Sequence, residues 1–363
     1  MALALGFSAA ACGSDSAPDA GPLEIRTDNS EKGDPQLGPE RIRITPGGLW
    51  TPIFWVPLDD LEAGQRVGAR VNAQLTSCRP SDLAGSSDSS CKGTASYDFP
   101  AELEWRLILA DQASGGEIPK ANGTELAKPG RLDCTQALHH CVPVAQGEVE
   151  ITSSDEGDRL VAFVIRATSP KAKPCRPAEP SRCNVLQLTP GQGRLGVLRV
   201  SDPSAVPPPA SLATERELAQ ELELAETDAE KKNRREVVYS LELKQAGPLV
   251  IEGLLQAEYD ARGQPIPPLV SKELVLASSP NAIDGKPVAP QNGENCSGEC
   301  EFAQPAVVPC VTQDDLDAGR RYLNLVAFSA RESAFAKGSA PVAVRGGGYL
   351  RAAQYEASLV PDC

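Results

Sequence analysis

The chain has 363 residues, of which 35 are basic and 49 acidic, giving a formal net charge of −14. Its length allows two hydrophobic cores of ordinary size, and its acidity argues against nucleic acid and anionic membrane surfaces as partners. With 31 glycines, 32 prolines and 4% aromatic residues, the composition is typical of strands, turns and loops. We therefore expect a mainly β protein.

Residues 1–12, MALALGFSAAAC, form a short apolar stretch that ends in three alanines directly before Cys12. This segment resembles a bacterial lipoprotein signal, in which a small-residue box precedes the cysteine that is lipidated and becomes the first residue after cleavage. The resemblance implies a lipid on Cys12, and Gly13 behind it implies delivery to the outer membrane. No later stretch is apolar enough for a membrane-spanning helix, so the lipid would be the anchor. The alternative is an ordinary alanine-rich N-terminus.

Residues 13–40 are rich in Ser, Asp, Gly and Pro and poor in aromatic residues. Such a segment buries too little apolar surface to fold, so it predicts a disordered tether.

Two stretches, 41–202 and 236–363, repeat each other and predict two domains. In 54–75, Val67, Ala69 and Val71 alternate with polar residues, which is the period of a half-buried antiparallel strand. The segments that align are, in order, 54–75 with 237–259, 105–111 with 272–279, 153–167 with 314–330, and 193–200 with 347–360. Short strands at this spacing favour a β-sandwich in each half.

The segment between them, 203–235, begins with Pro207–Pro209, which predicts an extended spacer. Thr214 and Glu217 then have the spacing of a capping box, and Leu218 and Leu222 share one helical face. We expect a connector helix over 213–235 that packs on its own protein. The alternative is that its leucine stripe docks on a partner.

An acidic, glycine-containing turn leads into an aromatic-bearing strand in both halves, at 153–167 and 314–330. This resembles the corner between strands E and F of immunoglobulin-like and fibronectin-like domains. The resemblance implies two Ig-like antiparallel β-sandwich domains, joined by the Pro-rich spacer and one α-helix. The Cys and Trp signature of true immunoglobulin domains is absent.

Ten of the eleven cysteines form short-range couples that are typical of disulfides in an oxidising compartment. The repeat relates two of the couples to one another. The predicted bridges are Cys78–Cys91, Cys134–Cys141, Cys175–Cys183, Cys296–Cys300 and Cys310–Cys363. The alternative for one couple is a zinc site made by Cys134, His139, His140 and Cys141, which lacks a CxxC spacing.

Acidic residues precede the presumed F strand in both halves and are candidate calcium ligands, because calcium takes six to eight oxygens. The candidates are Asp155, Asp158, Asp315 and Asp317. The competing interpretation is a solvated turn. No other cofactor is indicated.

The sequence contains no G-x-S-x-G nucleophile elbow, and its two histidines are adjacent. It therefore favours a cell-envelope lipoprotein that acts as a binding or structural module for an envelope protein or a polysaccharide. The alternatives are an extracellular hydrolase that uses paired carboxylates, whose separation a sequence cannot give, and a calcium-stiffened spacer.

Overall fold

The computed structural model describes residues 21–28, 41–43, 50–78, 102–112, 121–133, 140–167, 185–214, 222–224, 226–227, 232–233, 235–259, 268–296, 298–330, 342–360 and 363. Their regular structure is almost all strand, with one short helix, α2 (Gln313–Asp317), and one 3-10 turn, η3 (Ala357–Leu359). The expectation of a mainly β protein is confirmed. Within these ranges, no helix has the length and apolar character needed to cross a membrane.

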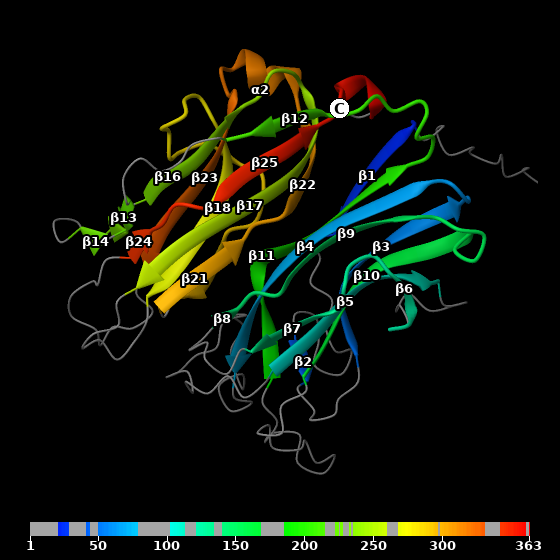
Figure 1. Ribbon diagram of the computed structural model, residues 1–363, viewed down its shortest axis with the longest axis horizontal. Coiled ribbons are helices and arrows are strands. Elements are labelled where there is room, and N and C mark those ends of the chain that lie inside the picture. Colours follow the sequence, from blue (N-terminus) through cyan, green and yellow to red (C-terminus); the bar gives the residue numbers. More distant parts are fainter. Residues whose placement is uncertain are drawn as a thin grey trace, which may run out of the picture.

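The N-terminal half is a sandwich of two antiparallel sheets (Figure 1). Its strands are β1 (Leu23–Asp28), β2 (Arg41–Arg43), β3 (Thr51–Leu61), β4 (Arg66–Cys78), β5 (Glu102–Asp111), β6 (Gly123–Glu125), β7 (Gly130–Asp133), β8 (His140–Cys141), β9 (Val144–Glu150), β10 (Gly157–Ala167) and β11 (Val185–Val200). One sheet has the order β1-β11-β4-β8, with β2 beside β11 and β9 beside β4. The other has the order β3-β10-β5-β6, with β7 beside β5.

The C-terminal half has the same plan. Its strands are β12 (Ala210–Ala213), β13 (Leu222–Leu224), β14 (Glu226–Thr227), β15 (Lys232–Asn233), β16 (Arg235–Glu242), β17 (Gly247–Tyr259), β18 (Leu269–Ala277), β19 (Lys286–Pro287), β20 (Asn292–Asn295), β21 (Gly298–Ala303), β22 (Ala306–Val311), β23 (Tyr322–Ala330), β24 (Val342–Val344) and β25 (Tyr349–Gln354). One sheet has the order β12-β25-β17-β24-β13, with β21 and β22 beside β17. The second has the order β16-β23-β18-β19, with β20 beside β18, and β14 and β15 pair as a separate two-stranded sheet.

The segments that align in the two halves form equivalent strands. β3-β10-β5 corresponds to β16-β23-β18, and β1-β11-β4-β9 corresponds to β12-β25-β17-β22. Even an irregularity is shared, because the register of β10 on β3 skips Ile53 and that of β23 on β16 skips Val238. Each half also encloses its own apolar core, one around Phe54 and Phe163 and the other around Tyr239 and Leu325.

The strand order differs from the expected immunoglobulin-like one. In an immunoglobulin domain the last two strands lie in the same sheet. Here β10 and β11 lie in opposite sheets, as do β23 and β25, and successive strands β3, β4 and β5 alternate between sheets. This alternation is the order of a jelly roll, which is also a two-sheet antiparallel sandwich.

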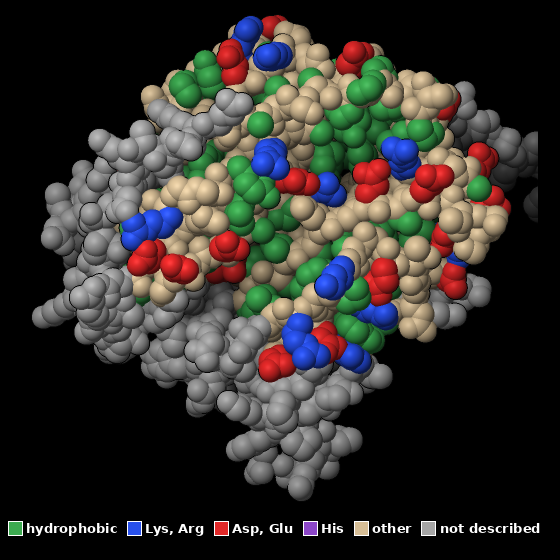
Figure 2. Space-filling model, in the orientation of Figure 1, with side chains coloured by type: hydrophobic (Ala, Val, Ile, Leu, Met, Phe, Trp, Pro, Cys, Tyr) green, Lys and Arg blue, Asp and Glu red, His purple; other side chains and the backbone are tan. Residues whose placement is uncertain are grey.

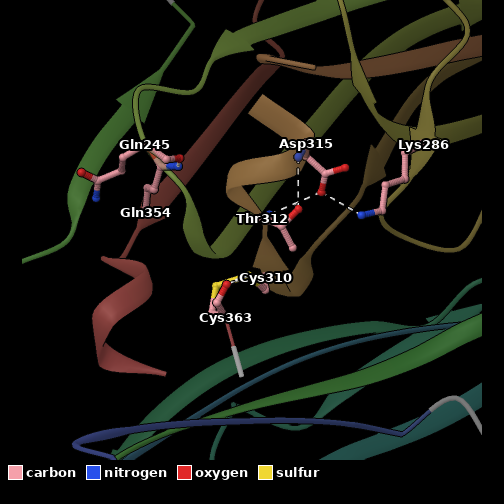
Figure 3. Close-up of a disulfide and its surroundings, with 7 residues drawn as sticks. All are labelled: Gln245, Lys286, Cys310, Thr312, Asp315, Gln354 and Cys363. Carbon is pink, nitrogen blue, oxygen red and sulfur yellow. Dashed lines mark hydrogen bonds and ion pairs between the residues drawn. A yellow bond between two sulfur atoms is a disulfide. The ribbon is translucent and has the colours of Figure 1, made fainter. Parts of the chain in front are cut away.

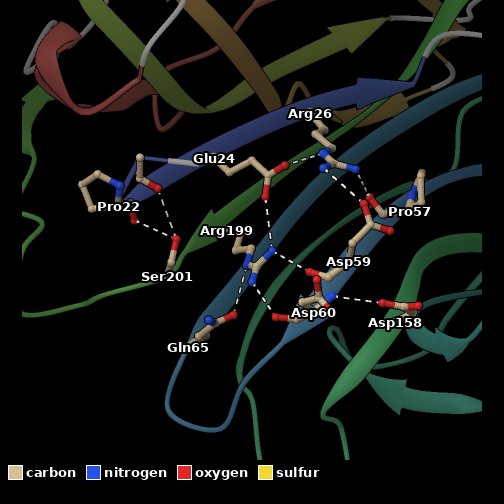
Figure 4. Close-up of polar contacts among 11 residues, drawn as sticks. Pro22, Glu24, Arg26, Pro57, Asp59, Asp60, Gln65, Asp158, Arg199 and Ser201 are labelled. Carbon is tan, nitrogen blue, oxygen red and sulfur yellow. Dashed lines mark hydrogen bonds and ion pairs between the residues drawn. The ribbon is translucent and has the colours of Figure 1, made fainter. Parts of the chain in front are cut away.

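The tether prediction is wrong for residues 23–28, which form strand β1. Glu24, Arg26 and their neighbours pair with β11 along the whole strand, and Leu23 is fully buried. Arg199 of β11 links this edge to β3: it donates hydrogen bonds to the Glu24 carboxylate at 3.5 Å and to the carbonyl oxygens of Asp59 and Asp60 at 2.8 and 2.9 Å (Figure 4). The alternation of Leu23 and Ile25 with polar residues is a strand signal that the polar composition of 13–40 masked.

The prediction of a connector helix over 213–235 is also wrong for the part of this segment that the structure describes. These residues form strands β13, β14 and β15, and β12 just before them pairs with β25. Leu222 and Leu224 pair with β24, and Leu224 is fully buried in the C-terminal core. Burial in a sheet outweighs the intrinsic helix preference of the sequence, which is a weak term.

The two halves pack against each other through the sheets that contain β11 and β22 (Figure 1). A buried apolar cluster joins Leu23 and Leu198 of the first half to Leu359 of the second. Gly196 allows close approach, because a Cβ atom there would lie 2.5 Å from the Cβ of Val307. The halves therefore share a packed interface.

The polar face of β4 lies in this interface, although its alternation predicts a solvent-facing side. Asn72 donates a hydrogen bond from Nδ2 to the carbonyl oxygen of Pro305 at 3.2 Å, and Gln74 accepts one from the Gly293 amide at 2.8 Å. Asn72 and Gln74 are only 2% and 3% exposed. A buried polar group must be hydrogen-bonded, so these contacts make the mutual position of the halves specific.

Candidate functional site

The acidic turn of the N-terminal half is organised by Asp155. Its carboxylate accepts hydrogen bonds from the hydroxyls of Thr124 at 2.6 Å and Thr152 at 2.5 Å. Burial alone would raise the pKa of this carboxyl, but these bonds outweigh it, so the pKa is lowered. Asp155 therefore holds its own turn against β6.

Asp315 performs the same task in the C-terminal half. It closes a capping box with Thr312 at the start of α2 and accepts hydrogen bonds from Lys286 of β19 at 2.8 Å and from Arg320 (Figure 3). Burial alone would raise its pKa, yet the bonds from Lys286 and Arg320 lower the pKa to about 2. β6 and β19 are equivalent strands. Both halves therefore have this corner, but the donor on the neighbouring strand is Thr124 in one half and Lys286 in the other.

The candidate calcium ligands are thus engaged within the protein. Asp158 accepts a hydrogen bond from the Asp60 amide and Asp317 one from the Gln313 side chain. A calcium ion at Asp155 or Asp315 would have to compete with the several donors that already bind those carboxylates. Among the described residues, no group of three or more His, Cys, Asp or Glu side chains is placed to hold a metal.

Two predicted bridges are present, Cys296–Cys300 and Cys310–Cys363. The second joins the chain end to β22, with Cα atoms 5.3 Å apart (Figure 3). Cys141 is disulfide-bonded, which removes it from the alternative zinc set. The other predicted bridge partners, Cys91, Cys134, Cys175 and Cys183, lie outside the described residues, as do the lipidation candidate Cys12 and the zinc candidate His139. The side chains of Cys78 and His140 also lie outside the described part of the structure.

A pocket that the sequence analysis missed lies on the outer face of the sheet β3-β10-β5-β6. Its volume is about 450 Å³. Arg166 of β10, Glu104 of β5 and Arg131 of β7 are directly opposite one another in the strand register. They therefore form one cross-strand row, since opposite residues project from the same face. The lining is Trp50, Glu104, Trp105, Arg106, Pro129, Gly130, Arg131 and Arg166.

Glu104 lies between two guanidinium groups. It accepts hydrogen bonds from Arg166 Nε at 2.7 Å and from Arg131 Nη2 at 2.6 Å. Burial alone would raise its pKa, but the hydrogen bonds and charges of Arg166 and Arg131 outweigh this and lower the pKa. Glu104 therefore stays ionised and holds both arginines on the pocket floor.

Trp50, directly before β3, forms the aromatic wall. The guanidinium carbons of Arg166 and Arg106 lie 4.5 and 5.4 Å from its ring centroid. Cation–π contacts of this kind hold the positive groups over the ring. Arg106 is tied further by an ion pair with Glu125 at 2.7 Å and a hydrogen bond to the Ala121 carbonyl oxygen. Arg131 and Arg166 are less constrained, with side chains 66% and 38% exposed.

The repeat shows that the fold does not require these side chains. By strand register, Trp50, Glu104, Arg106, Arg131 and Arg166 correspond to Arg235, Ser271, Glu273, Gly293 and Phe328. In that half, Arg235 is neutralised by ion pairs with Glu273 and Asp284. The arginine row is therefore a property of the N-terminal half alone.

The pocket is more cationic than the chain as a whole. On the face shown in Figure 2, acidic and basic side chains are interspersed without a large patch of either sign. The pocket brings three arginines to two carboxylates, Glu104 and Glu125, in a chain whose net charge is −14. The sequence signal was the pair of charged residues, Glu104 and Arg106, that flank Trp105 directly before the apolar run 107–110; their partners are distant in sequence.

No family model matches this chain, and no curated protein does. Among solved structures, it is similar to that of infectious bursal disease virus Gx strain, with 10% identity, 92% of this chain and 72% of that chain covered, and a TM-score of 0.28. The tandem CBM22-1–CBM22-2 domain from Paenibacillus barcinonensis Xyn10C has 12% identity, 92% and 91% coverage and a TM-score of 0.20. Empty particles of cowpea mosaic virus have 8% identity, 87% and 91% coverage and a TM-score of 0.23. At these TM-scores the similarities carry no argument.

Proposed function

We propose that this chain is a non-catalytic binding module of the cell envelope, anchored in the outer membrane by a lipid on Cys12. Its two sandwich halves would be two domains held as one body, and its ligand an envelope protein or a polysaccharide. The Trp50–arginine pocket carries this proposal. It combines a concave shape, an aromatic wall and partly exposed guanidinium groups, which are features of ligand sites.

The hydrolase alternative has less support at this pocket. A glycosidase needs one carboxyl with a raised pKa to protonate the leaving group. Glu104 has a lowered pKa because of its arginine partners, so it is unsuited to that role. The calcium-stiffened spacer has less support as well, because Asp155 and Asp315 already accept hydrogen bonds from protein donors.

The test is capture of envelope components by the full chain after mild crosslinking, with bound proteins identified by mass spectrometry and retained polysaccharide quantified. We expect a reproducible ligand that is lost in Trp50→Ala. Arg351→Ala is the matched control, because Arg351 is an exposed arginine that lies over an aromatic ring, Tyr349, in the other half. Equal capture by wild type and Trp50→Ala, with unchanged melting temperatures, would remove the pocket from the proposal.

The anchor is tested separately by Cys12→Ser in the cells that make the protein. We expect wild type to sediment with the membranes and the variant to be unlipidated and to stay in the soluble fraction. Unchanged membrane fractionation of Cys12→Ser would contradict the lipid anchor and leave the binding proposal untouched.

A further inference from the structure

We infer that the Trp50–arginine pocket takes a carboxylate-bearing sugar, that is, a uronic acid residue of an acidic polysaccharide. This inference rests on the proposed function and names the ligand class of the same pocket.

The charge of the pocket fits a monoanion. Arg106, Arg131 and Arg166 are opposed by Glu104 and Glu125, which leaves one positive charge. The chain's net charge of −14 opposes polyanions at long range, so this positive charge would act on a single carboxylate at short range, within a Debye length. A bound carboxylate would bring the net charge of the pocket to zero. A phosphate dianion would make the net charge negative and would lie close to the negative charge of Glu104.

The donors fit a planar carboxylate. Arg131 and Arg166 already hold the carboxylate of Glu104 between them, which shows that their guanidinium planes can be shared by one such group. A guanidinium has five N–H donors. Arg131 uses Nη2 on Glu104 and Arg166 uses Nε and Nη2, so each retains donors for a second carboxylate in the pocket.

The position of the lining fits a ring better than an extended peptide. A peptide that binds by strand addition uses the backbone groups of a sheet edge. Here Glu104, Arg106 and Arg166 project from β5 and β10, which are interior strands paired on both sides. The guanidinium groups of Arg166 and Arg106 lie over the Trp50 ring, so a bound sugar ring would meet this arginine–tryptophan stack with its carboxylate toward the guanidinium groups.

The experiment measures binding of trigalacturonate to the full chain by calorimetry, with its methyl ester as the uncharged counterpart. We expect the ester to bind at least tenfold more weakly, because it loses the charge-assisted bonds. Arg131→Ala, at an exposed position, is expected to weaken trigalacturonate binding at least tenfold, while Arg351→Ala leaves it unchanged. Higher salt should weaken the acid and not the ester.

The inference is overturned if wild type does not bind trigalacturonate, if the acid and the ester bind equally, or if Arg131→Ala and Arg351→Ala behave alike. Competition by polyglutamate as strong as that by trigalacturonate would indicate an acidic protein ligand and would also overturn it. In each case, capture of another envelope component that depends on Trp50 would still support the proposed function. Capture that does not depend on Trp50 would contradict the pocket as the binding site, and this inference with it.

Discussion

Single carboxylates organise the corner that leads into β10 and β23. In each half a threonine three residues earlier shares hydrogen bonds with the aspartate, as Thr152 does with Asp155 and Thr312 with Asp315. The second donor comes from a strand that is distant in sequence, namely Thr124 or Lys286. The local spacing can be read from the sequence, but the distant donor cannot, and it is the donor that makes the aspartate structural.

Asp315 predicts a specific dependence of stability on pH. Its pKa is lowered from 3.8 to about 2 in the folded chain, so folding favours the ionised form. The resulting stabilisation, on the order of 2 kcal/mol, is fully present above pH 4 and is lost as the pH falls from about 4 to 2. We expect Asp315→Asn to lower the free energy of unfolding in urea at pH 7 by about this amount, and the difference from wild type to shrink towards pH 2.

Asp317→Asn is the control for this experiment, because Asp317 lies in the same helix but accepts its hydrogen bond from the exposed side chain of Gln313, about one turn earlier, and not from Lys286 or Arg320. It should change stability little across the same pH range. A difference between Asp315→Asn and wild type that is independent of pH would show that the carboxylate charge does not stabilise this corner.

Individual strands were predictable where one face is apolar and the other is polar. In β4 the alternation of Val67, Ala69 and Val71 with polar residues identifies the strand and the face that points into the core. It cannot indicate what covers the other face, which here is the C-terminal half. The same limit applies to the pocket, because the row of Arg166, Glu104 and Arg131 exists only through the pairing of three strands.

Strands were not predictable where composition or helical spacing gave a stronger local signal. β1 lies in a segment dominated by Ser, Asp, Gly and Pro, and β13 lies in a segment with leucines at helical spacing. In both cases pairing with a distant strand, β11 or β24, decides the structure. Such non-local pairing leaves little trace in the segment itself.

The status of β1 as a folded element is tested by two truncations. Removing residues 1–28 deletes β1, exposes the edge of β11 and removes Leu23 from the cluster that it shares with Leu198 and Leu359. We expect a loss of several kcal/mol, seen as a drop of at least about 5 °C in melting temperature by calorimetry. Removing residues 1–20 leaves β1 in place and should keep the melting temperature of the full chain; equal melting of the two truncations would mean that β1 does not stabilise the fold.

At the scale of the whole molecule, the two halves differ in what they expose but share one buried interface. Apolar packing around Leu198 and Leu359 is combined there with buried hydrogen bonds from Asn72 and to Gln74. Ion pairing between Arg70 and Glu252 at 3.3 Å adds a further link. Because each half would leave these groups without partners on its own, we expect the halves to unfold together in a single calorimetric transition.

Gly196→Val tests this coupling. The backbone of Gly196 has ordinary dihedral angles, but a Cβ there would lie 2.5 Å from the Cβ and 2.8 Å from the Cγ2 of Val307 in the other half. Neither group can move without separating β11 from β22, so the added side chain should act as a wedge. We expect two calorimetric transitions in place of one and a larger radius of gyration in solution scattering.

Gly68→Ala, on the neighbouring strand β4, is the matched control, because its nearest contacts would be at an ordinary 3.8 Å. If Gly196→Val keeps a single transition at the wild-type temperature, the halves are not coupled through this interface, and the body that presents the pocket is the N-terminal half by itself.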